Sequence, residues 1–218
     1  MVLSALLIAF MKDFFAEGRP HEGLSYEEYL ADWRAQKEAA PSGEGGKEER
    51  KLHHYVRYNY ERSEQVHARY EPSEKLQEAL SAIEVAQLWM VLTESWCGDS
   101  AFCLPVIAEA AGRSEQVTLR ILPRDDNLDI MDQYLTGGSR SIPKLVAFEV
   151  GSGEERFVWG PRPKGAQNRF DEEAESSDDK EEIVKGLLEH YEDGGWEAVD
   201  PELAEALAQA PRPRAERA

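Results

Sequence analysis

The chain has 218 residues, enough for one substantial hydrophobic core or for a domain of about 110 residues with sizeable extensions. Asp and Glu outnumber Lys and Arg by 43 to 25, and a formal net charge of −18 argues against a nucleic acid partner, because phosphates attract basic surfaces. Two cysteines are too few for the disulfide framework of a small secreted scaffold, so a reducing, cytoplasmic location is predicted.

An apolar segment opens the chain, from Val2 to Phe10. It is shorter than the roughly 20 residues that span a bilayer, and no Lys or Arg precedes it as in a secretory signal. Met11 offers an alternative start, so residues 1–23 are assigned to an N-terminus that is either non-native or flexible. No membrane partner is expected.

A helical extension is predicted over residues 24–83. Its first helix has apolar residues on one face, and Ser25 precedes Glu28 with the spacing of a capping box. A Gly-rich connector at 40–46 follows, and Pro72 is expected in the first turn of the last helix. The three helices are predicted at 24–38, 48–70 and 72–83.

Three histidines in this extension raise the question of a metal site: His53, His54 and His67. The first two are adjacent and therefore point to different faces of a helix, and no Cys or acidic residue stands at ligand spacing. Solvated helix surface is the better interpretation. Neither a metal nor another cofactor is predicted.

The pattern changes after the extension, where an apolar run at 88–92 predicts a strand buried on both faces of a parallel or mixed sheet. A Gly-Ser-Gly turn at 151–153 predicts an antiparallel hairpin. The element order is β-α-β-α-β-β followed by helix, which is an α/β fold with a central mixed sheet flanked by helices. The domain is assigned to 84–195, and a terminal helix with a disordered tail to 196–218. The remaining elements are predicted at 98–111, 116–122, 127–135, 144–150, 155–159, 170–191 and 201–210.

The first strand runs into Trp96 and Cys97, and a helix follows directly. This order places the sulfur of Cys97 at a helix N-terminus. Unpaired N–H groups and the helix dipole favour the thiolate there, so the position suits a nucleophilic cysteine.

Four features together resemble the thioredoxin superfamily: the element order, the Trp-Cys-Gly sequence at 96–98, Pro105, and the Ser-Ile-Pro sequence at 141–143 before a strand. The closest resemblance is to a bacterial thioredoxin-like subgroup with a long helical N-terminal extension and the Trp-Gly-Pro-Arg-Pro string found here at 159–163. It covers about residues 25–200. The resemblance implies a thioredoxin-like fold.

The resemblance also implies roles for residues around Cys97. Pro143 would be the cis proline that lies against the active-site sulfur, and the backbone of Ile142 would pair with a substrate chain. Trp96 would shield the thiol and contact substrate, although simple packing against the helix end is the alternative.

The chain departs from the dithiol pattern of the family at two positions. Ser100 stands where a resolving cysteine would release a mixed disulfide, and Val91 stands where the family has a buried acid. Asp99 places a negative charge beside the sulfur and opposes the helix dipole, and Glu94 either adds to that charge or serves as a base. We expect Cys97 to be a single nucleophile, with Ser100 hydrogen-bonding its thiolate.

The second cysteine, Cys103, is a poor replacement for the missing thiol. Six residues along a helix give about 9 Å of rise and side chains roughly 120° apart, whereas a disulfide needs Cα atoms within about 7 Å. A buried structural cysteine is the favoured interpretation. Local unwinding near Pro105, which would let Cys103 act as a second thiol, is the alternative.

Three cations could surround the predicted cis proline. Arg140, Lys144 and Arg162 are expected to form a small basic rim near Pro143. Such a rim would offset Asp99 and receive an acidic ligand such as glutathione; scattered surface cations are the alternative.

Two functions from different classes remain open. The first is a monothiol thiol-disulfide oxidoreductase or reductase, in which Cys97 attacks a protein disulfide or a glutathione adduct and an external thiol reductant resolves the product. The second is a redox-inactive module that holds an extended peptide at the Pro143 edge. A reversible thiol sensor without turnover shares features with both.

Overall fold

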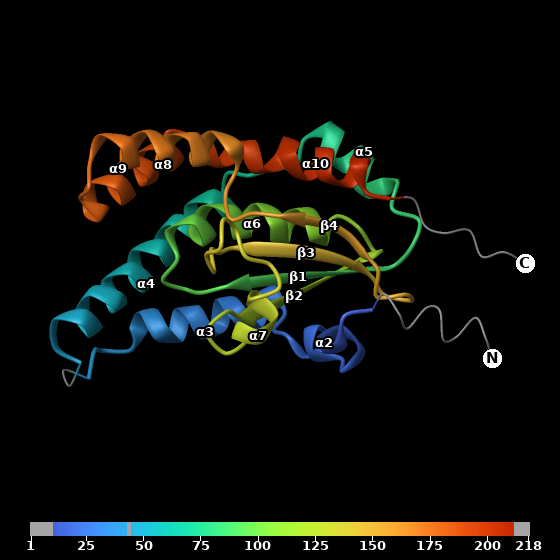
Figure 1. The fold of residues 1–218 in the computed structure, drawn as a ribbon, viewed down its shortest axis with the longest axis horizontal. Helices are drawn as coiled ribbons and strands as arrows, with labels where there is room; N and C mark the ends of the chain where they lie inside the picture. Colours follow the sequence, from blue (N-terminus) through green and yellow to red (C-terminus); the bar gives the residue numbers. More distant parts are fainter. Residues whose placement is uncertain (1–10, 43–44, 212–218) are drawn as a thin grey trace, which may run out of the picture.

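The computed structural model describes residues 11–42 and 45–211, and Figure 1 shows a four-stranded sheet at its centre. The strand order is β2-β1-β3-β4, with β1 parallel to β2 and antiparallel to β3, and β4 antiparallel to β3. The mixed α/β sheet predicted from the sequence is therefore confirmed. The strands are β1 (Gln87–Thr93), β2 (Val117–Pro123), β3 (Lys144–Glu149) and β4 (Glu155–Trp159).

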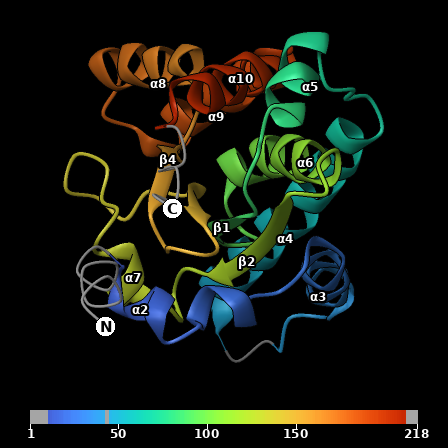
Figure 2. The ribbon, with the colours of Figure 1, turned by 90° about the vertical axis from the view of Figure 1, so that its right-hand side faces the viewer.

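Helices lie on both faces of this sheet, as Figure 2 shows. The α-helices are α2 (Asp13–Ala16), α3 (Tyr26–Glu38), α4 (Gly46–His67), α5 (Glu74–Ser81), α6 (Gly98–Gly112), α7 (Leu128–Met131), α8 (Lys164–Ser176), α9 (Lys180–Glu192) and α10 (Val199–Gln209). Two short 3-10 helices are η1 (Arg19–Glu22) and η2 (Gly195–Ala198).

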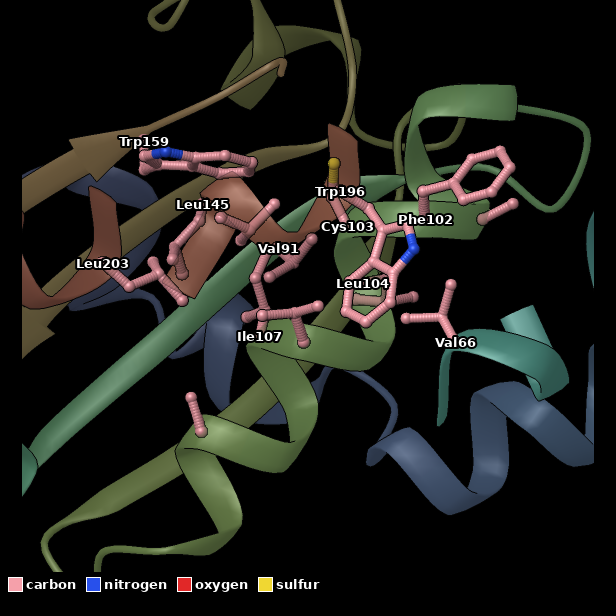
Figure 3. Close-up of a cluster of buried hydrophobic side chains, with 14 of the residues drawn as sticks. Val66, Val91, Phe102, Cys103, Leu104, Ile107, Leu145, Trp159, Trp196 and Leu203 are labelled. Carbon is pink, nitrogen blue, oxygen red and sulfur yellow. The ribbon is translucent and has the colours of Figure 1, made fainter. Parts of the chain in front are cut away.

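The larger hydrophobic core lies between the sheet and α6 (Figure 3). Val91 of β1 and Leu145 of β3 lie among Leu104 and Ile107 of α6, and all four side chains are fully buried. Trp33 of α3 belongs to the same core and donates from its indole N–H to a backbone carbonyl of α4. The N-terminal helices therefore share one core with the sheet.

The opposite face of the sheet is covered by α2 and α7. Phe14 and Phe15 of α2 are buried and pack on Phe148 of β3, with ring centroids 6.0 and 4.8 Å apart. Residues 11–23 thus include α2 and η1 as packed elements. The alternative start and flexibility expected for the N-terminus stay predictions for residues 1–10, which lie outside the described residues.

Two elements differ from the sequence-based expectation. The single helix expected at 170–191 is two helices, because the chain breaks before Asp179, whose side chain accepts from the backbone N–H of Glu181 at 2.8 Å and caps α9. The helix expected at 127–135 ends at Met131. After it the chain forms turns in which backbone hydrogen bonds join residues three apart. The other helices and strands lie close to their expected bounds.

The division of the chain into segments that begin at residues 24, 84 and 196 stays a prediction. The part of the tail beyond residue 211, which was expected to be disordered, lies outside the described residues. Within the described part of the chain, no helix combines the length and apolar character needed to cross a membrane.

Candidate active site

Cys97 is the N-cap of α6, at the end of the sheet where β1 finishes. Its backbone carbonyl accepts from the N–H of Ala101 at 3.2 Å. Its side chain is 7% exposed, and the thiol donates a hydrogen bond to the carbonyl oxygen of Ile142 with Sγ and O 3.3 Å apart. The helix N-terminus predicted for the sulfur is therefore observed.

The thiol lies beside the segment that precedes β3. The peptide bond between Ile142 and Pro143 is cis, in agreement with the family resemblance. Ile142 is buried in the same hydrophobic cluster as Cys97. The structure thus brings the predicted nucleophile next to Ile142 and Pro143, two of the three residues predicted to bind substrate.

The pKa of Cys97 differs from the expectation drawn from the helix N-terminus. Burial raises the pKa of the thiol to about 11, and the negative charge of Asp99 adds to this effect. The side chain and N–H of Ser100 and the N–H of Asp99 act in the opposite direction but are weaker. The neutral thiol is therefore the main form at pH 7, because desolvation outweighs the hydrogen bonds at the helix end.

Asp99 lies inside the molecule in a buried ion pair. Arg162 donates to both carboxylate oxygens from Nε and Nη2, at 3.0 and 2.7 Å, and the hydroxyl of Tyr191 in α9 donates at 2.7 Å. Burial raises the pKa of Asp99, whereas Arg162 and Tyr191 act against that rise. The guanidinium of Arg162 also lies over the ring of Phe170, 4.5 Å from its centroid.

Of the three cations expected near Pro143, Arg162 offsets the charge of Asp99 as expected, whereas Lys144 and Arg140 have other partners. Arg162 pairs with the buried Asp99. Lys144 is 4% exposed and donates to the side chain of Thr136 at 2.6 Å and to a backbone carbonyl at 3.0 Å, and burial lowers its pKa. Arg140 forms an ion pair with Asp132 at the surface, 2.6 Å.

Ser100 occupies the third position of α6 and is fully buried. Its Oγ accepts a hydrogen bond from the hydroxyl of Thr93 at 2.6 Å, which leaves its own proton free to face Cys97. Val91 is fully buried in the large hydrophobic core, so this position carries no proton-handling group. The catalytic role predicted for Ser100 stays a prediction.

Trp96 contacts two residues that were not predicted from the sequence to belong to the site. Its carbonyl accepts from the side-chain amide of Asn59 in α4 at 2.8 Å, and the guanidinium of Arg124 lies over its ring, 4.9 Å from the centroid. Neither residue stands in a recognisable motif, so only the tertiary structure reveals them. The substrate contact predicted for Trp96 stays a prediction.

Glu94 and Tyr29 are two further polar side chains whose pKa is raised. Glu94 accepts from the backbone N–H of Asp125 at 2.8 Å, and burial raises its pKa. Tyr29 of α3 was not predicted to belong to the site. Its buried hydroxyl has no hydrogen-bond partner among the described residues. Burial raises the pKa of Tyr29, and the charge of an ionised Cys97 would raise it further.

Cys103 is a free, fully buried thiol whose Sγ lies 3.9 Å from the hydroxyl oxygen of Tyr191. Cys97 is also free. Burial raises the pKa of Cys103 well above its ordinary value, with the charge of Asp99 adding to it. Across the described residues, no group of three His, Cys, Asp or Glu side chains is placed to hold a metal ion.

Comparison with known proteins identifies a related family. A family model described as Thioredoxin matches residues 45–181. The chain is similar to a protein of unknown function from Pseudomonas aeruginosa, at 17% identity over 85% of this chain and 98% of that chain, with a TM-score of 0.49. It is also similar to an HIV epitope-scaffold, at 17% identity over 86% of this chain and 100% of that chain, with a TM-score of 0.50. No curated protein matches the chain.

Proposed function

Because the chain belongs to the thioredoxin family, we propose that it performs thiol–disulfide exchange through Cys97 alone. The observation that carries this proposal is the position of the thiol, at the N-terminus of α6 and 3.3 Å from the carbonyl of Ile142 beside cis Pro143. Trp96, Ile142 and Pro143 would contact the substrate. A reducing, cytoplasmic location is part of the proposal, since the second step needs an external thiol.

The exchange takes place in two balanced steps. The thiolate of Cys97 attacks one sulfur of a protein disulfide or glutathione adduct, the old S–S bond breaks, and the departing sulfur takes its electron pair. The thiolate of an external reductant then attacks the substrate sulfur of the mixed disulfide, a new disulfide forms between the reductant and that sulfur, and Cys97 departs with the electron pair of the broken bond. Ser100 has no sulfur for the second step; its hydroxyl donates to the Cys97 thiolate instead.

The raised pKa makes this chemistry slow at neutral pH. With a pKa of about 11, roughly one Cys97 in 10,000 is ionised at pH 7, against about 1% for a thiol with the ordinary pKa of 9.0. The higher nucleophilicity of a more basic thiolate recovers only about tenfold of this difference. We therefore expect exchange that speeds up steeply with pH.

The proposal is tested by mass spectrometry of intact protein carrying Cys103→Ala. Incubation with hydroxyethyl disulfide, and separately with oxidised glutathione, should add one adduct to the folded protein at pH 9, and dithiothreitol should remove it. The Cys97→Ser/Cys103→Ala protein is the matched control. If Cys97 forms no adduct when folded but does when unfolded in urea, the enzyme proposal fails.

A second candidate is the redox-inactive peptide-binding module, which the neutral, buried thiol favours. In that case the Pro143 edge holds an extended chain without any sulfur chemistry. Cys97→Ser would then leave peptide binding unchanged. If the serine variant instead loses every partner that the wild-type protein retains, and reduction releases those partners, the exchange proposal is supported over the module.

A further inference from the structure

A groove of about 660 Å³ lies between α4 and α9. Figure 1 shows that both helices extend past the end of the sheet at which β1 leads into α6, so the groove projects outward from the thiol end. Its apolar lining is Tyr55, Val184 and Leu188, and Val184 is 39% exposed. The groove therefore offers an apolar surface that the described residues leave open to solvent.

The residues that line this groove carry a net positive charge, whereas the whole chain is negative. Five of its lining residues are Lys or Arg and three are Glu, whereas the chain has 25 basic and 43 acidic residues. All three Glu are in ion pairs with lining cations, which are Lys51–Glu181 at 2.9 Å, Arg62–Glu192 at 3.1 Å and Lys185–Glu189 at 3.6 Å. No acidic side chain of the described residues pairs with Lys47 or Arg50, so the groove keeps an excess of positive charge.

The inner end of the groove is linked to both neighbours of Cys97, to Gly98 through Leu188 and to Trp96 through Arg62 and Asn59. A methyl group built on Gly98 would lie 3.2 Å from Cδ2 of Leu188. Arg62 donates to the side-chain carbonyl of Asn59 at 3.2 Å, and Asn59 donates to the carbonyl of Trp96 at 2.8 Å. The inner end of the groove therefore lies close to the segment that carries Cys97.

We propose that the groove between α4 and α9 binds an acidic segment of the protein substrate and leads that substrate to Cys97. Carboxylates of the segment meet Lys47 and Arg50, and one apolar side chain packs on Val184 and Leu188. The 15 helical steps from Lys47 to Arg62 give about 22 Å of helix, which about seven residues of extended chain would cover. This inference rests on the proposed function, for which it names the class of substrate.

The test uses two peptides of about ten residues that differ only in charge, one rich in Asp and Glu with a single Leu, the other with Asn and Gln in their place. Each carries one cysteine as a mixed disulfide with thionitrobenzoate. Attack by Cys97 forms a disulfide with the peptide cysteine, and the S–S bond to thionitrobenzoate breaks and releases a coloured thiolate. We expect the acidic peptide to react roughly tenfold faster at low salt, with the difference lost at high salt.

Charge reversal in the groove supplies the matched comparison. Lys47→Glu/Arg50→Glu should remove the preference for the acidic peptide, whereas Arg57→Glu/Lys75→Glu makes the same change in net charge outside the groove and should keep it. Equal rates for the two peptides with wild-type protein, or an unchanged preference in the groove variant, would overturn the proposal.

A binding measurement separates failure of the groove from failure of the chemistry. In the Cys97→Ser protein, fluorescence anisotropy of a labelled, cysteine-free acidic peptide should show binding that the groove variant weakens about tenfold. Binding without thionitrobenzoate release would refute exchange and keep the groove. Tighter binding of a single-stranded oligonucleotide of equal charge, or self-association of the chain that the groove reversal abolishes, would assign the groove to another occupant and overturn the proposal.

Discussion

Arg162 holds Asp99 in a two-point ion pair, with N–O distances of 3.0 and 2.7 Å. Asp99 is two residues from Cys97, and its negative charge contributes to the raised pKa of that thiol. The hydroxyl of Tyr191 in α9 donates a further hydrogen bond to Asp99. Through these contacts, Arg162 in the segment after β4 and Tyr191 of α9 hold the carboxylate that adds to the raised pKa of Cys97.

Asp99→Asn should lower the pKa of Cys97 from its value of about 11, because it removes a negative charge and leaves Arg162 uncompensated. Alkylation of Cys97 by iodoacetamide as a function of pH, in a Cys103→Ala background, gives that pKa. The same variant should cost about 3–5 kcal/mol in unfolding free energy, since a buried charge loses its partner.

The matched control is Asp132→Asn, which breaks the surface pair with Arg140 and should leave the Cys97 pKa unchanged. A pKa that stays at about 11 or rises in Asp99→Asn would show that Asp99 does not act on the thiol.

Stability should depend on pH through Cys97. Its pKa is about 11 in the folded protein against an ordinary value of 9.0, so between these values the unfolded state binds fewer protons and stability falls as pH rises. Two pH units correspond to about 2.7 kcal/mol. The difference in unfolding free energy between wild-type and Cys97→Ser protein, measured with urea at pH 8 and pH 11, should shrink by that order. A constant difference would contradict the raised pKa.

Ser100→Cys should supply the missing resolving thiol. The new sulfur would stand three residues after Cys97 on the first turn of α6, at the spacing of the dithiol members of the family. After incubation with oxidised glutathione we expect an internal disulfide, seen as the loss of two hydrogens from the intact mass, and with dithiothreitol as reductant we expect faster reduction of insulin disulfides. Cys97→Ser/Ser100→Cys is the control, and activity that survives in it would show that another thiol attacks.

Trp33→Ala should destabilise the protein by about 3–5 kcal/mol, because it opens a large cavity and removes the hydrogen bond from the indole N–H to the carbonyl of Val56 at 3.0 Å. Trp33 is fully buried. Leu52→Ala, at a side chain that is 48% exposed, should change the free energy of unfolding by no more than about 0.5 kcal/mol. Urea unfolding curves monitored by circular dichroism give the free energy of unfolding of each variant and of the wild-type protein.

The order of elements could be predicted because its signals are local. The apolar run of β1 marks a strand buried on both faces, and Ser25 and Glu28 form the capping box that their spacing indicates. The break between α8 and α9 was missed, because a single side-chain cap at Asp179 decides it within a uniformly charged stretch.

The electrostatics of the site could be predicted only in part. Asp99 was expected to oppose ionisation of Cys97, and it does. The larger effect is burial, which depends on how tightly the rest of the chain packs around the sulfur and has no signature in the sequence near Cys97. Arg162 lies 63 residues from Asp99 along the chain, so its pairing with that carboxylate appears only in three dimensions.

In the proposed exchange, the high pKa of Cys97 would also govern how fast a captured partner is released. A thiolate that holds its proton tightly is a poor leaving group, so an incoming thiol expels Cys97 from a mixed disulfide slowly. The lifetime of such a complex is then set by the concentration and reactivity of the external thiol. A protein of this kind would hold its partner in a long-lived mixed disulfide, in contrast to a dithiol member of the family, whose second cysteine releases the partner rapidly.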